Sequence, residues 1–181
     1  MASAFGHAFT AIAIRSGFSK KETYKFTLLG IFCAVVPDAD TIGFKFGVAY
    51  DSFFGHRGFT HSLVFAVFLG LLITGLFYRS CLKNYKGFYY VIFFTLCAAS
   101  HSILDAMTSG GLGVAFFSPF DNTRYFFPWR PIKVSPIDVG SFFGERGLRV
   151  IKSELVWIGI PCTLFIILSK VIKSVFKRNQ R

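Results

Sequence analysis

Long apolar runs alternate with short polar segments along this chain. Residues 62–78, 87–107 and 154–172 each approach the roughly 20 apolar positions that a helix needs to cross a membrane. Two further apolar segments, 4–14 and 24–36, are shorter. The pattern predicts an all-α, multi-pass helical membrane protein with about five apolar helical segments, three of them clear spans and two of them shorter N-terminal segments.

The polar segments predict where these helices end. Pro37 is expected to stop the second helix, and residues 41–58 show no clear period and are expected to be irregular. Residues 112–153 are predicted to form one long aromatic and basic loop, and loops of this length are commonly functional. Residues 173–181 form a basic tail. There is no internal repeat, so we expect a single domain over residues 1–181.

Composition also favours a membrane environment. The chain is 53% hydrophobic, holds 25 Phe and has a mean hydropathy of +0.54, which exceeds what the core of an ordinary soluble domain would bury. The net charge of +11 would suggest nucleic acid on a soluble domain. Cytoplasmic loops of membrane proteins also collect Lys and Arg, so we expect no nucleic-acid partner. The cysteines show no close pairing and are expected to be free thiols.

The charged residues separate into two sets when the chain is threaded up and down through the membrane. One set contains all the histidines and comes to one side: His7, Asp38, Asp40, His56, His61, His101, Asp105 and Glu154. The other set is basic and comes to the opposite side with the tail: Arg15, Lys20, Lys21, Lys25, Arg79, Lys83 and Lys86. The positive-inside rule makes the basic side cytoplasmic, so the histidine set is predicted to face the periplasm or the cell exterior.

The histidine set has the chemistry of a metal site. His101 and Asp105 are four residues apart on a predicted helix and therefore share a face, while His56 and His61 flank a turn at Gly58. Imidazole with carboxylate suits Zn²⁺, although Mn²⁺ and Mg²⁺ are compatible with part of the set. Eight candidate ligands exceed the four that one zinc ion needs, so two or more ions are plausible, with Asp38 or Asp105 as the bridging carboxylate.

Phosphoester hydrolysis is the reaction that such a site would serve. Metal ions activate water near neutral pH and stabilise the attacking and leaving oxygens. Asp40 or Asp51 is a candidate general base. Cationic side chains on the same side would bind substrate phosphate, and Arg57 would act in the catalytic site as well. The phosphate-binding candidates are Arg57, Arg124, Arg130 and Lys133.

Each of these residues also has a structural interpretation. His7 could cap a helix, and Asp38 and Asp40 could be turn residues after a proline. Asp105 could pair with an arginine, and Glu154 in a first helical turn is favoured by the helix dipole. The set as a whole is harder to explain in this way, because His101 and Asp105 lie within an apolar span where polar groups are costly.

Four segments carry a resemblance to a known family. They are His7, the Pro37-Asp38-Ala39-Asp40 segment, residues 55–62 with the sequence Gly-His-Arg-Gly-Phe-Thr-His-Ser, and His101-Ser102-Ile103-Leu104-Asp105. Together with residues 126–132 and 153–155, these resemble the YdjM-type family of bacterial inner-membrane proteins. The resemblance implies a membrane-bound metal-dependent hydrolase of the inner membrane, distantly similar to the zinc-dependent phospholipase C and nuclease group.

The expected function is therefore hydrolysis of a phosphate ester of a membrane lipid, either a phospholipid or a polyprenyl phosphate. Two alternatives remain open at this point. Intramembrane His and Asp also mark ion pathways, so the chain could transport or bind a divalent metal. It could also be a non-catalytic scaffold that a metal stabilises. No His-Glu-x-x-His pattern occurs, which argues against a peptidase.

Overall fold

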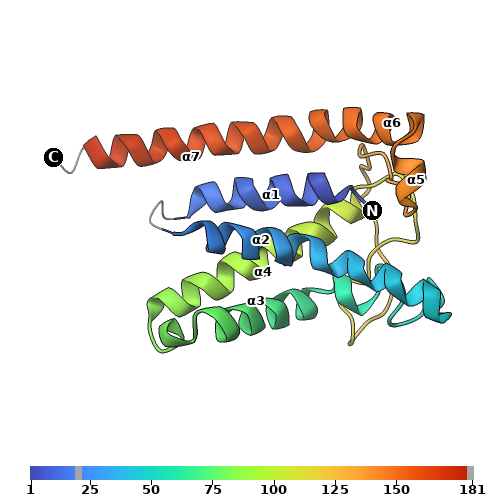
Figure 1. The fold of residues 1–181 in the computed structure, drawn as a ribbon, viewed down its shortest axis with the longest axis horizontal. Helices are drawn as coiled ribbons and strands as arrows, with labels where there is room; N and C mark the ends of the chain where they lie inside the picture. The colour runs from blue at the N-terminus through green and yellow to red at the C-terminus, as the bar shows by residue number, and fades with distance from the viewer. Residues whose placement is uncertain (19–21, 179–181) are drawn as a thin grey trace.

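The structure, a computed structural model, describes residues 1–18 and 22–178, and within them it is helical (Figure 1). Four helices form a bundle: α1 (Ala4–Gly17), α2 (Tyr24–Val35), α3 (Leu63–Phe77) and α4 (Tyr85–Ala106). A last helix, continuous from α6 (Glu145–Glu154) through the π-helical turn η4 (Leu155–Gly159) to α7 (Ile160–Arg178), runs along α1. The described residues contain no β-sheet, so the all-α class is confirmed.

Shorter helical pieces complete the fold. Three are 3₁₀ helices, namely η1 (Val36–Phe46), η2 (Phe59–His61) and η3 (Arg79–Cys81), and one is the α-helical turn α5 (Val139–Phe142). The N-terminus and the segments after η1 and α4 lie at one end of the molecule. The C-terminal end of α1, the start of α2, the α3–α4 connection and the C-terminal end of α7 lie at the other end, as the threading of the chain predicts (Figure 1).

Three helices are long and apolar enough to cross a membrane, and the last two of them coincide with predicted spans. They are Tyr24–Phe46, Tyr85–Ala106 and Glu145–Arg178, whereas Leu63–Phe77 has only 15 residues. The prediction that Pro37 stops the second helix is wrong in part, since α2 ends at Val35 but η1 continues it. Pro37 lies at the start of η1, where the missing N–H has no intrahelical partner to lose.

The prediction of one loop over residues 112–153 is also wrong at its C-terminal end, because α6 begins at Glu145. The helix is amphipathic: Gly147, Val150 and Glu154 are buried at helical spacing, while charged residues cover the other side. Because α6 contains no long apolar run, the pattern of apolar segments in the sequence does not predict it as a helix. Glu154 is consequently inside a continuous helix and is not its first residue. The tail prediction changes too, since 173–178 belong to α7, while 179–181, like Lys20 and Lys21, lie outside the described residues.

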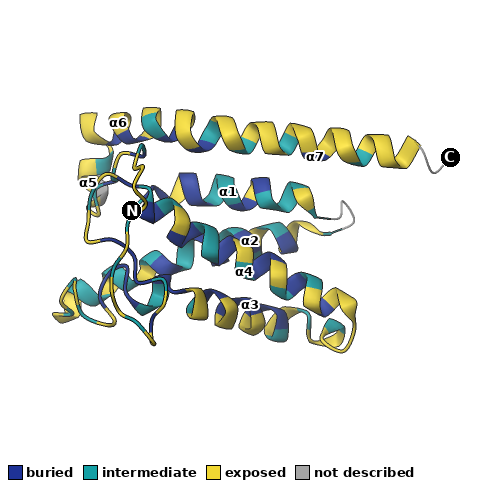
Figure 2. Cartoon of the chain, turned by 180° about the vertical axis from the view of Figure 1, so that it is seen from behind, coloured by how far each residue is buried: buried dark blue, intermediate teal, exposed yellow. Residues whose placement is uncertain are grey.

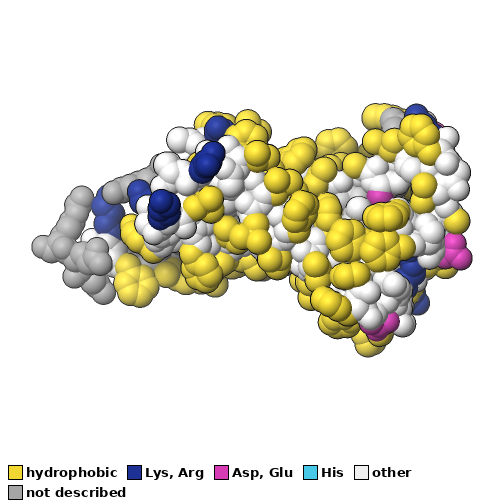
Figure 3. Space-filling view, turned by 90° about the horizontal axis from the view of Figure 1, so that it is seen from below, with side chains coloured by type: hydrophobic (Ala, Val, Ile, Leu, Met, Phe, Trp, Pro, Cys, Tyr) yellow, Lys and Arg dark blue, Asp and Glu magenta, His cyan; other side chains and the backbone are white. Residues whose placement is uncertain are grey.

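The outer surface of the bundle suits lipid. Apolar side chains of α3 and α7 are largely exposed, and only 6% of the most apolar window of Glu145–Arg178 is buried inside the protein (Figure 2). Seen from the α3 side, hydrophobic side chains cover the middle of the molecule (Figure 3). On that face the Asp and Glu side chains lie toward one end, opposite to the end where α7 terminates. This distribution fits a helical membrane protein.

Helices α3 and α4 approach closely at Gly70. A Cβ atom there would lie 2.2 Å from Thr95 Oγ1 and 2.9 Å from the Val91 carbonyl oxygen. Small residues allow such close backbone approach between membrane helices. Gly70→Val is therefore expected to lower stability by about 1–3 kcal/mol, as overpacking does in cores. The measurement is thermal unfolding in detergent. Gly75→Val on the same helix is the matched control, because no atom lies within 4 Å of its added Cβ, and an equal loss in both variants would contradict the prediction.

Candidate metal centre

Two buried histidines face each other at the centre of the site. His61 Nε2 and His101 Nε2 are 2.9 Å apart. His101 Nδ1 is 2.8 Å from the Ala34 carbonyl oxygen, which can only accept, so the His101 proton is on Nδ1. His61 is fixed in the same way, because Thr60 donates its hydroxyl proton to Asp40 and can only accept from His61 Nδ1, at 3.1 Å. With both rings neutral, two lone pairs therefore point at each other, and a metal ion or a proton between the two nitrogens removes the repulsion.

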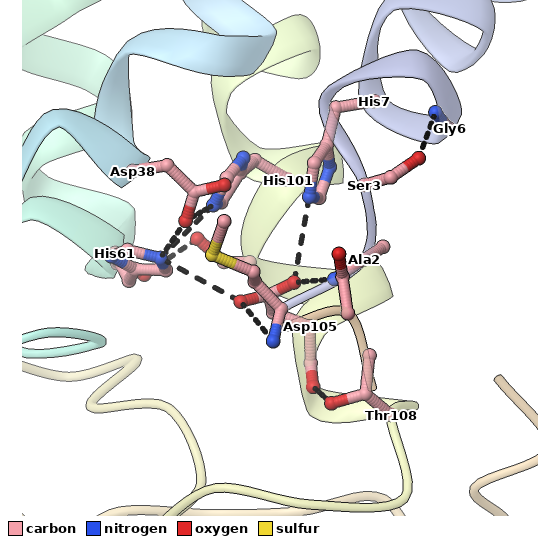
Figure 4. A network of polar contacts seen from close by, with 12 residues as sticks. Ala2, Ser3, Gly6, His7, Asp38, His61, His101, Asp105 and Thr108 are labelled. Carbon is pink, nitrogen blue, oxygen red and sulfur yellow. Dashed lines mark hydrogen bonds and ion pairs between the residues drawn. The ribbon is translucent and has the colours of Figure 1, made fainter. Parts of the chain in front are cut away.

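Two carboxylates complete the group around these nitrogens (Figure 4). Asp38 Oδ1 lies 3.4 Å from His101 Nε2 and 3.6 Å from His61 Nε2, is buried, and accepts no hydrogen bond from a described residue. Asp105 Oδ2 lies 3.8 Å from His61 Nε2. Ligands of a tetrahedral zinc ion with bonds of about 2.0 Å would be about 3.3 Å apart. The four residues, each offering one atom within 4.8 Å of the others, thus have the separations and the chemistry of a metal-binding set.

The local structure brings these four residues together from three parts of the chain. His101 and Asp105 share one face of α4, as predicted, while Asp38 lies in the first turn of η1 and His61 ends η2. Ser102 donates to the His61 carbonyl oxygen at 2.6 Å and so joins η2 to α4. The loop before η2 is tight, since a Cβ at Gly58 would lie 2.3 Å from the Phe53 carbonyl oxygen.

Asp40 and His56 lie immediately behind this group. Asp40 Oδ1 is 2.8 Å from His56 Nδ1, and Asp40 Oδ2 accepts from the Thr60 hydroxyl at 2.7 Å and from the Arg57 backbone N–H at 3.2 Å. Asp40, His56 and His61 form a second possible metal-binding set. Because both Asp40 oxygens accept hydrogen bonds, we interpret Asp40 as the carboxylate that orients the two imidazoles, a common arrangement behind metal-ligating histidines.

The electrostatics differ between the histidines. Burial alone would lower the pKa of His61, but the Asp38 and Asp40 carboxylates raise it to about 9. Burial lowers the pKa of His56 and of His7, which keeps both imidazoles neutral near pH 7. The carboxylates thus stabilise a positive charge at His61, which is either its own proton or a metal ion that replaces it, while His7 and His56 keep the neutral form that a metal ligand needs.

His7 is adjacent to the metal-binding set. Its ring stacks on that of His101 with centroids 3.8 Å apart, and its Nε2 lies 3.4 Å from Asp105 Oδ1. The side chain is fully buried, yet neither ring nitrogen makes a hydrogen bond with a described residue. Buried imidazole nitrogens without a partner are costly, so His7 is a further candidate ligand on the Asp105 side.

Glu154, predicted as a ligand, is not brought to this group. Its carboxylate accepts from the backbone N–H and the hydroxyl of Ser3. The prediction assumed that Glu154 opens the last span, whereas the helix begins at Glu145 and places Glu154 against the start of α1. The structure therefore assigns Glu154 a packing contact between the last helix and the N-terminal segment.

The predicted phosphate-binding and catalytic residues mostly contact protein groups. Arg57, fully buried with a positive φ of 66°, donates to Asp105 Oδ2 at 3.0 Å, to the Gly110 carbonyl oxygen and to Thr108. Arg124 donates to the carbonyl oxygens of three loop residues: Tyr50, Ser52 and His56. The side chains of Arg130, Lys133 and Asp51 are exposed, and Arg130 lies over the Phe126 ring. Sequence reasoning assigned no role to Thr60 and Ser102, although both lie within the histidine motifs that it singled out.

The fold and this centre define an all-α membrane protein with a buried His and Asp cluster that could hold a metal ion. The chain belongs to the YdjM inner membrane protein family, whose model matches residues 1–177. It is 42% identical over 159 residues to the inner membrane protein YbcI of Escherichia coli (strain K12), a match that covers 86% of this chain and 89% of that protein. No solved structure matches the chain. The predicted family is confirmed, and a bacterial inner-membrane location follows from it.

Proposed function

We propose that this protein is a metal-dependent hydrolase that cleaves a phosphate ester of a membrane lipid. The observation that carries the proposal is the 2.9 Å approach of two imidazole nitrogens beside the unpartnered Asp38 oxygen, within a buried group of four possible ligands. A divalent ion, for which Zn²⁺ suits the donor set best, would supply a Lewis acid that activates water and polarises the phosphoryl group. The positive-inside tendency further supports a periplasmic or external position of the centre.

The protein residues would have separate roles. Asp38, His61, His101 and Asp105 would hold the ion, with His7 beside Asp105. Asp40 would orient His61 rather than act as general base, because its oxygens already accept hydrogen bonds. Arg57 would hold Asp105 in position, which leaves the exposed Arg130 and Lys133 as the candidates for contact with substrate phosphate.

Transport of the metal is the alternative that the sequence raised. A transport path needs ligands spread through the membrane depth. Among the described residues, the two possible metal-binding sets share His61 and therefore lie at one place. This arrangement supports a fixed catalytic ion over a transported one.

The test is to strip the purified protein with a chelator, restore it with Zn²⁺, and assay phosphate release from a phospholipid and from a polyprenyl phosphate. We expect activity only after metal addition, and a loss of at least about 100-fold in Asp38→Asn, since even a partner behind a ligand is worth 10–100-fold. Asp121→Asn, at a partly exposed carboxylate that belongs to neither metal-binding set, is the matched control and should keep full activity. Metal-independent turnover, or full turnover in Asp38→Asn, would refute the proposal.

A further inference from the structure

An apolar groove of about 770 Å³ lies between the N-terminal half of α1 and the last helix. Its walls include Phe5 and Phe9 of α1 and Ile158, Ile160 and Leu164 of the last helix. Among the described residues that line it, Glu154 is the one ionisable group. The groove forms where the last helix widens into the π-helical turn η4, a feature that often marks functional sites in helices. Its volume is within the range of ligand-binding pockets.

The groove is oriented as a lipid chain would be. Its lining residues on the last helix run from Ile151 to Leu164, about 20 Å at roughly 1.5 Å per residue. That helix is a candidate span, so this length runs across the membrane. The wall continues outward into exposed apolar residues of α7, including Phe165 and Leu168, that form the lipid-facing surface (Figure 2). The groove is therefore continuous with the bilayer, which supplies its occupant.

The polar end of the groove adjoins the metal centre. Two consecutive residues separate them: the Ala2 backbone N–H donates to Asp105 Oδ1 at 2.7 Å, and Ser3 donates to Glu154. One turn further along α1, Gly6 lines the groove while His7 stacks on His101 in the centre. A lipid whose chain occupied the groove would hold its polar end near Ser3 and Ala2, and Ala2 contacts Asp105 of the cluster.

We infer that this groove binds one hydrocarbon chain of a membrane lipid and so presents the headgroup ester to the metal centre. The substrate class is then an amphiphile with a long chain, and short water-soluble phosphate esters would be poor substrates. The inference rests on the proposed function only in treating the bound lipid as substrate. Binding of the chain itself depends on the groove, not on hydrolysis.

Gly159 allows the groove to be filled without disturbing the helix. It lines the groove, and an added Cβ would make only ordinary contacts, 3.6 Å from the Glu154 carbonyl oxygen and 3.8 Å from Leu155 Cδ2. Gly159→Leu therefore places a side chain where the hydrocarbon chain would lie. Gly75→Leu on α3 is the matched control, since it adds the same side chain at a position with no atom within 4 Å of its Cβ.

The experiment places the full chain in phosphatidylethanolamine and phosphatidylglycerol vesicles that contain a phospholipid with a diazirine on one acyl chain. After illumination, adducts are mapped by mass spectrometry. We expect adducts at Phe9 and Leu164 to exceed those at Ile172 of the lipid-facing surface. Gly159→Leu should lower the groove adducts by about tenfold or more, because each displaced methylene contributes roughly a fourfold factor in affinity. Gly75→Leu should leave them unchanged.

Equal labelling of the groove and of Ile172, or groove adducts that persist in Gly159→Leu, would overturn the inference. Labelling of Ile172 without any labelling of the groove would also overturn it, since protein, such as a second copy of the chain, would then cover the groove in place of lipid. The same labelling in His61→Ala separates the two proposals. His61→Ala should keep the groove adducts and lose hydrolysis. If the wild type gives groove adducts but no hydrolysis, the groove stands and the hydrolase is refuted. If the wild type hydrolyses lipid but gives no groove adducts, the hydrolase stands and the groove is refuted.

Discussion

His61→Ala and His101→Ala are each expected to abolish stoichiometric binding of a divalent metal. Each removes one of the two imidazole nitrogens that face each other at 2.9 Å, so the remaining ligands are too few to hold the ion tightly. In the wild-type protein, a ligand at 100 times its dissociation constant stabilises the fold by about 2.7 kcal/mol. We expect this metal-induced stabilisation to vanish in both variants. The measurements are elemental analysis and thermal unfolding with and without Zn²⁺.

Asp40→Asn is the graded control for these variants. Asp40 orients His61 through Thr60 but offers no oxygen to the facing nitrogens, so its loss should weaken metal binding by about 10–100-fold without abolishing it. Asp121→Asn, at the surface, should bind metal as the wild type does. If the histidines form only a hydrogen-bonded network, the wild-type protein will purify without stoichiometric metal and Zn²⁺ will not raise its unfolding temperature.

The parts of the centre that could be predicted from the sequence follow from the helical repeat and from the alternating direction of the apolar segments. The spacing of His101 and Asp105 places both on one helical face whatever the surroundings, and α4 is the helix that was expected there. His61 and Asp38 lie beside them because successive membrane segments alternate in direction, which brings these two segment ends to the same side. Residue types at segment ends were therefore enough to predict that these four residues lie together.

Other features depend on contacts that no local pattern encodes. Arg57 was expected to bind phosphate, but the left-handed backbone at this residue and the tight loop around Gly58 place its guanidinium on Asp105. Glu154 was expected to open a helix, but polar residues N-terminal to it are also helical, and amphipathic segments escape a search for apolar runs. Pro37 was expected to stop a helix that continues as η1.

Arg57→Met is expected to destabilise the protein by about 3–5 kcal/mol, because it leaves the buried Asp105 carboxylate without its cationic partner. Methionine has a similar reach and, like arginine, carries a Cβ at the positive φ of this position, so backbone strain is the same in both proteins. Saturating Zn²⁺ should reduce the loss, since an ion at the cluster would supply Asp105 with positive charge. Denaturant unfolding in detergent, with and without Zn²⁺, measures both quantities.

Two further variants decide what Arg57 does. Arg130→Met removes an exposed guanidinium that lies over Phe126 and should change stability by no more than about 0.5 kcal/mol. Arg57→Lys keeps the charge but loses the fork that reaches Asp105, Thr108 and the Gly110 carbonyl oxygen together, so its stability should fall between those of wild type and Arg57→Met. If Arg57 served mainly to bind substrate phosphate, Arg57→Met would unfold like the wild type and its defect would be confined to a raised KM. A large loss of stability that Zn²⁺ partly restores instead identifies Arg57 as the residue that holds Asp105 in place.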